Sequence, residues 1–340
     1  MPTTVMAGAL FTAGLRTEFS GNYSKAKREG DSRIQAMMDL DIPSDKLTEY
    51  FAYTLSAPHM GRWERGKDIG NKPFGSVGFN VTNKTYGKRV SWHREDREDD
   101  QTKSLVSAAQ ACGRSAGLLD ERTLIQIETA ASDPNLLLAI PNAPDGAALF
   151  SATDGAGGAR FGATGGNLQT GTGVATPQAI YNDFWSAMSQ FQAFQDTEGQ
   201  PLFSDAELDG GVTVLYSSSN RRVFEEAFKR EHDVVIITNP ILGGTENVAV
   251  ATPDNLLQKG QRGRITLFPT PRKTDNDWSV WLNGCWVKPI FSLAREGIKE
   301  ESATMDTSDY SKDTGIEFQQ WHLRRGYGVN LPFGVIKVNN

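Results

Sequence analysis

Residues 76–100 read SVGFNVTNKTYGKRVSWHREDREDD, and residues 101–131 continue as QTKSLVSAAQACGRSAGLLDERTLIQIETAA. Apolar residues alternate with polar residues or glycine from Val77 to Val81, and a second alternating run extends from Tyr86 to Trp92. A period of two is typical of β-strands, and the polar residues 83–85 between the runs favour a turn. Residues 76–93 therefore predict a two-stranded hairpin.

This hairpin carries too little apolar surface to form a core of its own. A lone hairpin is marginally stable in water, and this one contains many charged residues. We therefore expect it to lie outside the core of its own subunit and to gain stability by lying across a neighbouring molecule.

The second segment has the spacing of an amphipathic helix. Its apolar residues fall on one stripe: Leu105, Ala109, Cys112, Ala116 and Leu119, continued by Leu124, Ile125 and Ile127. Asp99 and Asp100 precede it, where negative charge favours the helix dipole, and Pro134 follows it. A helix over 101–131 would be roughly 45 Å long, which is unusual for a globular domain.

The flanking segments are less regular. Residues 1–59 are expected to form an arm with short helical pieces, because Leu47, Tyr50, Phe51 and Leu55 have helical spacing and Pro58 ends the run. Residues 133–176 are rich in glycine and alanine, for example GAGGARFGATGG at 155–166. Such a run is unusual in a compact domain, so we expect either a mobile loop or a segment that becomes ordered on assembly.

The last half of the chain predicts mixed helix and strand. Thr176 followed by Pro177 favours the start of a helix, and Ser219–Asn220 favours the start of another. Apolar runs predict strands at 212–216, 234–237, 265–268, 278–282, 286–293 and 316–321.

Composition excludes several classes of protein. The chain has 340 residues, of which 38% are hydrophobic and 22% charged, and its apolar runs are too short to span a bilayer. Residues 5–15 lack the preceding basic residues of a signal peptide. Two cysteines, Cys112 and Cys285, fit a reducing cytoplasm and small buried roles. The net charge of −6 argues against sequence-specific nucleic-acid binding, although an acidic wall would repel packaged DNA.

Two strings resemble catalytic motifs. Residues 61–68 nearly complete a phosphate-binding loop, but Asp68 stands where that loop needs a hydroxyl for magnesium. Residues 113–117 spell G-x-S-x-G, which would make Ser115 a nucleophile, yet the string lies inside a helical pattern instead of at a strand-to-helix turn. We therefore predict no catalytic residue, cofactor or metal ligand, and keep a cytoplasmic serine hydrolase using Ser115 as the alternative.

Residues 50–100 carry a resemblance to a known family. They resemble the major head subunits of Mu-like tailed bacteriophages through Tyr50, Pro58, Met60, Arg62, Trp63, Asn83, Lys84, Tyr86 and the cluster at 94–100. Pro144–Gly146 with Phe150, Gly166–Asn167 and Arg324–Gly328 extend the resemblance over most of the chain.

The resemblance implies an α+β capsid fold of the Hong Kong 97 type. The implied parts are an N-terminal arm at 1–59, an extended hairpin called the E-loop at 60–100, a first part of the peripheral domain at 101–177 with a spine helix at 101–131, an axial domain at 178–290, peripheral return strands at 291–326, and a C-terminal segment at 327–340.

The implied function is structural. Copies would form hexamers and pentamers of an icosahedral head shell around double-stranded DNA. Assembly would occur in the bacterial cytoplasm, without a membrane. The implied partners are a separate scaffolding protein and protease, a portal and decoration proteins. Another virion protein, of the tail or decoration type, is a further alternative. The contact residues that we predict belong to the hairpin: Arg62, Trp63, Arg65, Lys67, Lys84, Lys88, Arg89 and Trp92, with Arg94, Arg97 and Asp99 at its base.

Overall fold

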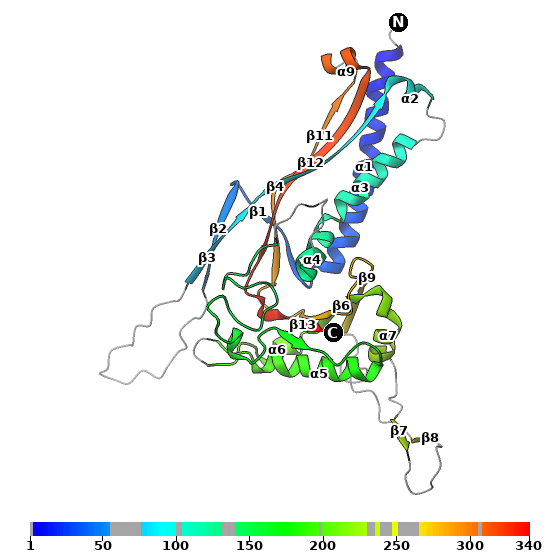
Figure 1. The fold of residues 1–340 in the computed structure, drawn as a ribbon. Helices are drawn as coiled ribbons and strands as arrows, with labels where there is room; N and C mark the ends of the chain where they lie inside the picture. Colours follow the sequence, from blue (N-terminus) through cyan, green and yellow to red (C-terminus); the bar gives the residue numbers. More distant parts are fainter. Residues whose placement is uncertain are drawn as a thin grey trace, which may run out of the picture. The chain divides into compact units, whose positions relative to one another are not determined.

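The computed structural model of the chain (Figure 1) describes residues 3–54, 76–99, 104–130, 136, 140–196, 199–229, 235–238, 247–250, 265–304 and 308–340. The chain divides into two compact units, one of residues 1–53, 77–144 and 290–330, called unit 1, and one of residues 54–76, 145–289 and 331–340, called unit 2.

Unit 1 is built on a four-stranded sheet in the order β1-β11-β12-β4. Its strands are β1 (Met38–Pro43), β11 (Ile290–Ala303), β12 (Ile316–Val329) and β4 (Lys84–His93). β1 runs parallel to β11 and the other pairs are antiparallel. Along β12 every second residue from Glu317 to Arg325 is buried, so one face of the sheet is covered.

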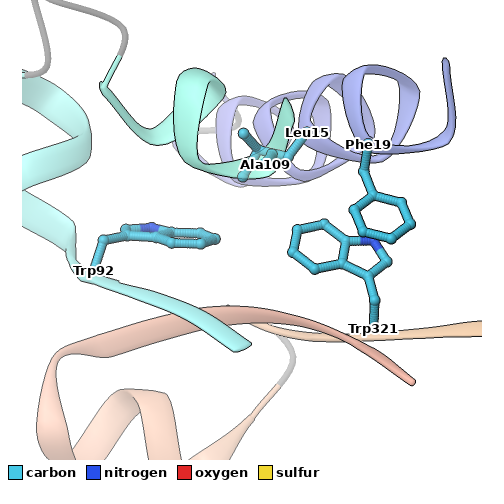
Figure 2. Close-up of a cluster of buried hydrophobic side chains, with 5 residues drawn as sticks. All are labelled: Leu15, Phe19, Trp92, Ala109 and Trp321. Atoms are coloured by element: carbon cyan, nitrogen blue, oxygen red, sulfur yellow. The ribbon is translucent and has the colours of Figure 1, made fainter. Parts of the chain in front are cut away.

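Three helices pack in unit 1, namely α1 (Thr3–Ile34), α3 (Ser104–Gly117) and α4 (Leu119–Thr129). Figure 2 shows the side chains that join the first two helices to the sheet. Leu15 and Phe19 of α1 and Ala109 of α3 meet Trp92 of β4 and Trp321 of β12 in one buried cluster. The rings of Phe19 and Trp321 stack with centroids 4.3 Å apart. This cluster is the core that fixes the helices on the sheet.

The predicted single helix at 101–131 is wrong in its length. The chain forms the short helix α2 (Arg94–Asp99), then α3, and breaks at Leu118 before α4 begins. α4 ends at Ala130, whose backbone is left-handed with φ 53°. It therefore ends before Pro134, the residue that the sequence suggested as its end. Gly117 ends α3, and a glycine there lowers the cost of leaving the helix. The apolar stripe continues across the break, which is why spacing alone did not reveal it.

The predicted short helical pieces at 1–59 are also wrong. Residues 3–34 form one continuous helix, and the segment expected to be helical after Ser44 holds the strand β2 (Thr48–Thr54). Phe51 of β2 packs against Phe79 and Phe291, with centroids 5.7 and 5.1 Å away, whereas Tyr50 is 68% exposed. The side chains of this segment therefore alternate between two faces, as in a strand, and tertiary packing overrides the helical spacing of its apolar residues.

Close approach of α1 to α3 depends on glycine. A Cβ built on Gly117 would lie 2.7 Å from the backbone nitrogen of Lys27 and 2.8 Å from the Cβ of Ala26, closer than atoms pack. Gly113 would likewise clash with the backbone of Phe19. The two glycines thus let the helices meet backbone to backbone.

Gly117→Ala should destabilise the protein, and Gly21→Ala should stabilise it. The first adds a methyl group where α1 leaves no space, at a cost of about 1–3 kcal/mol. Gly21 lies within α1 with nothing within 4 Å of a Cβ, so alanine there should gain about 0.5–1 kcal/mol. Chemical denaturation of both variants would measure this. Equal shifts of the same sign would contradict the role of Gly117.

Unit 2 contains a five-stranded sheet in the order β5-β13-β10-β6-β9. The strands are β5 (Leu168–Thr170), β13 (Val335–Asn339), β10 (Trp278–Leu282), β6 (Val212–Ser217) and β9 (Ile265–Thr270). Every residue of β6 and β10 is buried, as their continuous apolar runs suggest. The strands expected at 212–216 and 278–282 are confirmed, whereas β13 went unpredicted within the C-terminal segment.

The remaining elements of unit 2 include α5 (Pro177–Ala193), α6 (Asp205–Leu208), α7 (Arg221–Lys229) and the pair β7 (Val235–Thr238) and β8 (Asn247–Val250). The predicted start of α5 is confirmed, because the side chain of Thr176 accepts a hydrogen bond from the backbone of Ala179. Near the surface of unit 1, α9 (Asp309–Thr314) precedes β12. β11 and β12 each extend eight or more residues beyond the predicted strand ends.

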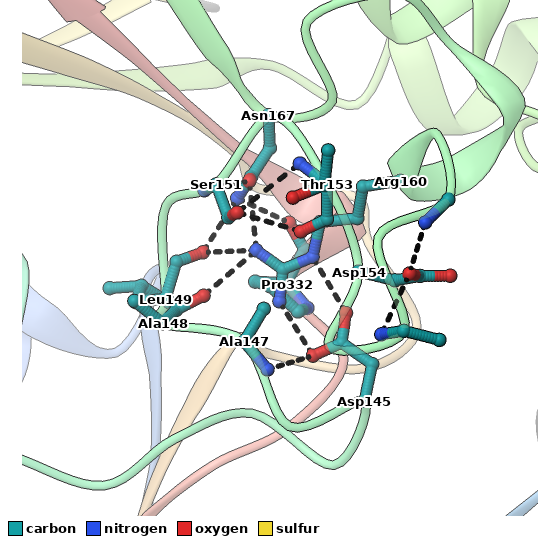
Figure 3. Close-up of polar contacts among 12 residues, drawn as sticks. Asp145, Ala147, Ala148, Leu149, Ser151, Thr153, Asp154, Arg160, Asn167 and Pro332 are labelled. Carbon is teal, nitrogen blue, oxygen red and sulfur yellow. Dashed lines mark hydrogen bonds and ion pairs between the residues drawn. The ribbon is translucent and has the colours of Figure 1, made fainter.

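The glycine-rich segment has a defined structure over residues 140–176, in place of the mobile loop that its composition suggests. Figure 3 shows the cause, which is a network around Arg160, a residue only 1% exposed. Its guanidinium contacts both carboxylate oxygens of Asp145, at 2.7 and 3.0 Å. It also donates to the carbonyls of Ala148 and Leu149 and to Oδ1 of Asn167.

Candidate intersubunit contact surface

The two strands of the predicted hairpin exist, but they do not pair with each other. β3 (Ser76–Thr82) pairs with β2, and β4 pairs with β12 in the main sheet of unit 1. The hairpin of the structure is therefore β2–β3, and residues 55–75 between those strands lie outside the described residues.

Asn83 explains why the prediction of a turn between β3 and β4 was wrong. The residue is 3% exposed, and its side-chain amide donates to the hydroxyl of Ser44 at 2.7 Å and to the carbonyl of Lys46 at 2.8 Å. Its backbone N–H donates to the carbonyl of Leu47. Asn83 thus joins the chain to segment 44–47, and the strands on either side of it continue into different sheets.

Segment 44–47 forms a turn that is held by Glu49. One carboxylate oxygen of Glu49 accepts hydrogen bonds from the hydroxyl of Ser44 and from the backbone N–H groups of Asp45 and Lys46, each at 3.0 Å. These bonds, that from the Lys46 backbone first, lower the pKa of Glu49. The base of the β2–β3 hairpin is therefore a defined structure.

The base of this hairpin also belongs to the core of its own subunit. Val81 is 4% exposed and lies in a buried cluster with Phe291 and Leu293, against which Phe51 and Phe79 pack. The expectation that segment 76–93 lies outside the core is therefore wrong. Its alternation identified strands correctly, but it could not show which other strands they would join.

The eleven predicted contact residues occupy different surroundings. Arg62, Trp63, Arg65 and Lys67 lie outside the described residues, as do the side chains of Arg97 and Asp99 in α2. Lys84, Lys88 and Arg89 are exposed on β4, and Arg94 is exposed at the start of α2. Trp92 is 3% exposed and its indole nitrogen donates to Glu317 at 3.0 Å, so it is a core residue and we leave it out of the contact surface.

The cations on β4 do not form one patch. Successive side chains of a strand point to opposite faces, so Lys84 and Lys88 share a face with Trp92, while Arg89 lies on the other. Arg89 donates to the side-chain oxygen of Gln320 at 2.7 and 3.0 Å and lies 4.1 Å from the ring centre of Phe318. β4 is an edge strand of its sheet, so its outer edge could pair with another chain.

Sequence reasoning missed the exposed apolar side chains. Among the described residues, the large hydrophobic residues that are exposed are Leu47, Tyr50, Trp286 and Tyr310. Their exposed fractions are 55%, 68%, 66% and 52%. Residue type alone does not separate an exposed Leu, Tyr or Trp from a buried one, so only the tertiary structure reveals these four side chains.

The catalytic alternative finds no support. Ser115 lies inside α3, and its hydroxyl is 3.5 Å from the guanidinium of Arg122. A nucleophile elbow needs a strand-to-helix turn, and here the two glycines of the string serve helix packing instead. The near phosphate-binding loop at 61–68 lies outside the described residues.

The described residues show neither a metal-binding cluster nor a membrane-spanning helix. They contain no group of three histidine, cysteine or acidic side chains arranged to hold a metal ion. In the same part of the chain, no helix combines the length and the apolar character needed to cross a bilayer. Cys285 is buried, Cys112 is half-buried, and both are free thiols.

Several solved structures from phages share this fold. The capsid of Cyanophage P-SCSP1u matches with a TM-score of 0.52 and 12% identity, covering 88% of this chain and 85% of that one. The mature capsid of bacteriophage PhiM1 matches with a TM-score of 0.50 and 11% identity over 90% and 86% of the two chains. A structure from Mycobacterium phage Patience gives 0.53 and 13% over 94% and 86%. The fold is therefore the α+β fold of phage capsid proteins, of the Hong Kong 97 type.

A family model narrows this class. Residues 12–135, which run from α1 through α4, match the family described as the Mu-like prophage major head subunit gpT. A comparison with curated proteins finds no match. The chain therefore has the fold of phage capsid proteins and, over residues 12–135, is similar to Mu-like major head subunits.

Proposed function

We propose that copies of this chain assemble into a closed icosahedral shell of hexamers and pentamers around double-stranded DNA. The match of residues 12–135 to a major head subunit, within a capsid fold, carries this proposal. Contacts between different patches of identical chains are heterologous, and they close into rings where the rotation permits. We further propose that assembly occurs in the host cytoplasm and involves a separate scaffolding protein and protease, a portal and decoration proteins.

We also propose that unit 1 is the peripheral domain and unit 2 the axial domain. Residues 54–76 of unit 2 stay with the arm and the E-loop, and the assignment moves residues 145–177 and 331–340 from the peripheral and C-terminal segments to the axial domain. The Arg160 network and the pairing of β13 with β10 both lie within unit 2 and support the assignment.

Electron microscopy of the expressed protein tests the function. The chain would be produced alone and together with its neighbouring head genes. We expect shells, or free hexamers and pentamers, in at least the second preparation. A compact monomer in both preparations would contradict the proposal.

Shortening the β2–β3 connection should abolish assembly without unfolding the subunit. We would replace residues 57–73 by a four-residue glycine–serine linker, which keeps both strands and removes the proposed contacts of Arg62, Trp63, Arg65 and Lys67. Circular dichroism would measure whether the subunit folds, and electron microscopy would show whether shells form. Deletion of residues 66–88 is unsuitable, since it removes β3 and half of β4 and should unfold unit 1.

A glycine–serine linker of the native length is the matched control. It keeps the reach of the segment and changes only its chemistry, so it should also fail if specific side chains make the contacts. Shells at the wild-type yield from both variants would show that this segment does not join subunits.

A further inference from the structure

The loop at 283–289, between β10 and β11 in unit 2, presents one tryptophan to solvent. Trp286 is 66% exposed, whereas Trp278 and Trp281 of the adjacent strand β10 are fully buried. An exposed indole keeps a large apolar surface in water, and such surfaces mark places where a partner binds.

The loop around Trp286 is braced by its other residues. The backbone N–H of Asn283 donates to the carbonyl of Gly211 at 2.9 Å, and the Asn283 side chain accepts from Thr213 at 2.8 Å. The amine of Lys288 donates back to the carbonyl of Asn283 at 2.8 Å, and the thiol of Cys285 donates to the carbonyl of Val287. A braced loop loses little entropy when its exposed side chain is bound.

Trp286 rests on an aromatic cluster that contains backbone strain. Its ring lies 5.6 Å from that of Phe333, a residue 3% exposed, and Phe333 also contacts Phe161 at 6.2 Å. Phe161 has φ 56°, in the left-handed region that is unfavourable for a bulky side chain. Strain of this kind persists only where the surrounding structure holds the residue firmly in place, and it is frequent at binding sites. Both observations point to a preformed anchor.

We propose that Trp286 is the anchor by which one subunit holds a second copy of this chain, through Leu47 and Tyr50 at the base of the second copy's β2–β3 hairpin. The inference rests on the proposed shell function, and it identifies the surface of one subunit that binds the hairpin of the next. Trp is among the residues most often found at the energetic centre of interfaces.

Apolar exposure and charge both favour this occupant. Leu47 and Tyr50 are both exposed and lie three residues apart at the base of the hairpin, whereas Tyr310 has a ring partner, Phe318, in its own subunit. Residues 45–50 carry one net negative charge, and residues 283–289 carry one positive charge, from Lys288. Two different patches on one chain make a head-to-tail contact, which a shell requires.

Hydroxyl-radical footprinting of the unmodified protein tests the burial of Trp286. The peptide that contains Trp286 should be oxidised in free subunits and protected in shells, while Trp281 should stay protected in both. Equal oxidation of Trp286 in both states would overturn the proposal. This test needs no variant, so it does not depend on the folding of one.

A double-mutant cycle tests the partner. Trp286→Ala and Tyr50→Ala should each raise the subunit concentration for half-maximal assembly by about tenfold, and the double variant should be no worse than either single one. Tyr310→Ala is the control and should assemble normally. Normal assembly of Trp286→Ala would overturn the anchor, and additive effects would overturn the hairpin as its partner. If the wild type forms no shells, the proposed function fails as well.

Discussion

Replacing Arg160 by methionine is expected to lower the free energy of unfolding by about 3–5 kcal/mol, because it removes one partner of a buried ion pair. Asp145 would lose its cation, and the carbonyls of Ala148 and Leu149 would each lose one donor. Oδ1 of Asn167, which is fully buried, would lose one donor and keep the backbone N–H of Ser151, while the Asn167 amide would still donate to Leu149 and Pro332. Chemical denaturation would measure the loss.

Two further variants distinguish the contribution of the hydrogen-bond network from that of the positive charge alone. Arg160→Lys keeps the charge but cannot present a planar fork to Asp145, so it should recover less than half of the loss. Arg222→Ala is the matched control, because the Arg222 side chain is 89% exposed and its pair with Glu226 should contribute below about 1 kcal/mol. A loss for Arg160→Met no larger than that for Arg222→Ala would contradict the account.

This network shows why the glycine-rich segment could not be predicted from its composition. The glycines and alanines of 155–166 suggest disorder, and the few residues that order the segment are spread over 145–167. Gly166, with φ 55°, leaves no space for a side chain beside the carbonyl of Ala152, so at least this glycine serves close packing. Composition records how many glycines there are, but not which buried side chain they surround.

The pairing partners of the strands could not be predicted from the sequence for a similar reason. Alternation located β3 and β4 nearly residue by residue, because it depends only on which side chains face the core. The pairing of β4 with β12 joins residues more than 200 positions apart, and nothing local encodes it. The resemblance to capsid subunits supplied what local patterns could not, namely the fold. The contact surface was predicted least well, because exposed apolar residues look like core residues in a sequence.

A second buried network joins the elements of unit 1. Asp120, at the start of α4, is 4% exposed and accepts hydrogen bonds from Arg325 at 2.9 Å and from the hydroxyl of Tyr327 at 2.8 Å. Arg325 also contacts Asp41 at 2.7 Å, and Lys27 of α1 contacts Asp41 at 2.9 Å. The network therefore connects α1, β1, α4 and β12 beside the break at Leu118.

The pKa directions within this network show that attraction outweighs burial. Burial alone would raise the pKa of Asp41, but the hydrogen bond from Lys27 and the charge of Arg325 lower it. Burial alone would lower the pKa of Lys27, yet Asp41 and Asp120 raise it. Both groups are thus held in their charged forms, and removal of one charge leaves the others buried with fewer partners.

Asp120→Ala is therefore expected to lower the free energy of unfolding by about 3–5 kcal/mol. The substitution leaves the buried guanidinium of Arg325 with Asp41 alone and leaves the hydroxyl of Tyr327 without its acceptor. Thermal and chemical denaturation would measure the loss.

Asp309→Ala is the matched control for Asp120→Ala, since the side chain of Asp309 is 94% exposed and pairs only with Lys312 nearby in α9. Its loss should stay below about 1 kcal/mol, as exposed ion pairs contribute little. Asp120→Asn should fall between the two, because an amide can still accept from Tyr327 but cannot neutralise Arg325. If Asp120→Ala were as stable as Asp309→Ala, the four elements would have to be held by apolar packing and strand pairing, and the ionic network would contribute nothing to the fold of unit 1.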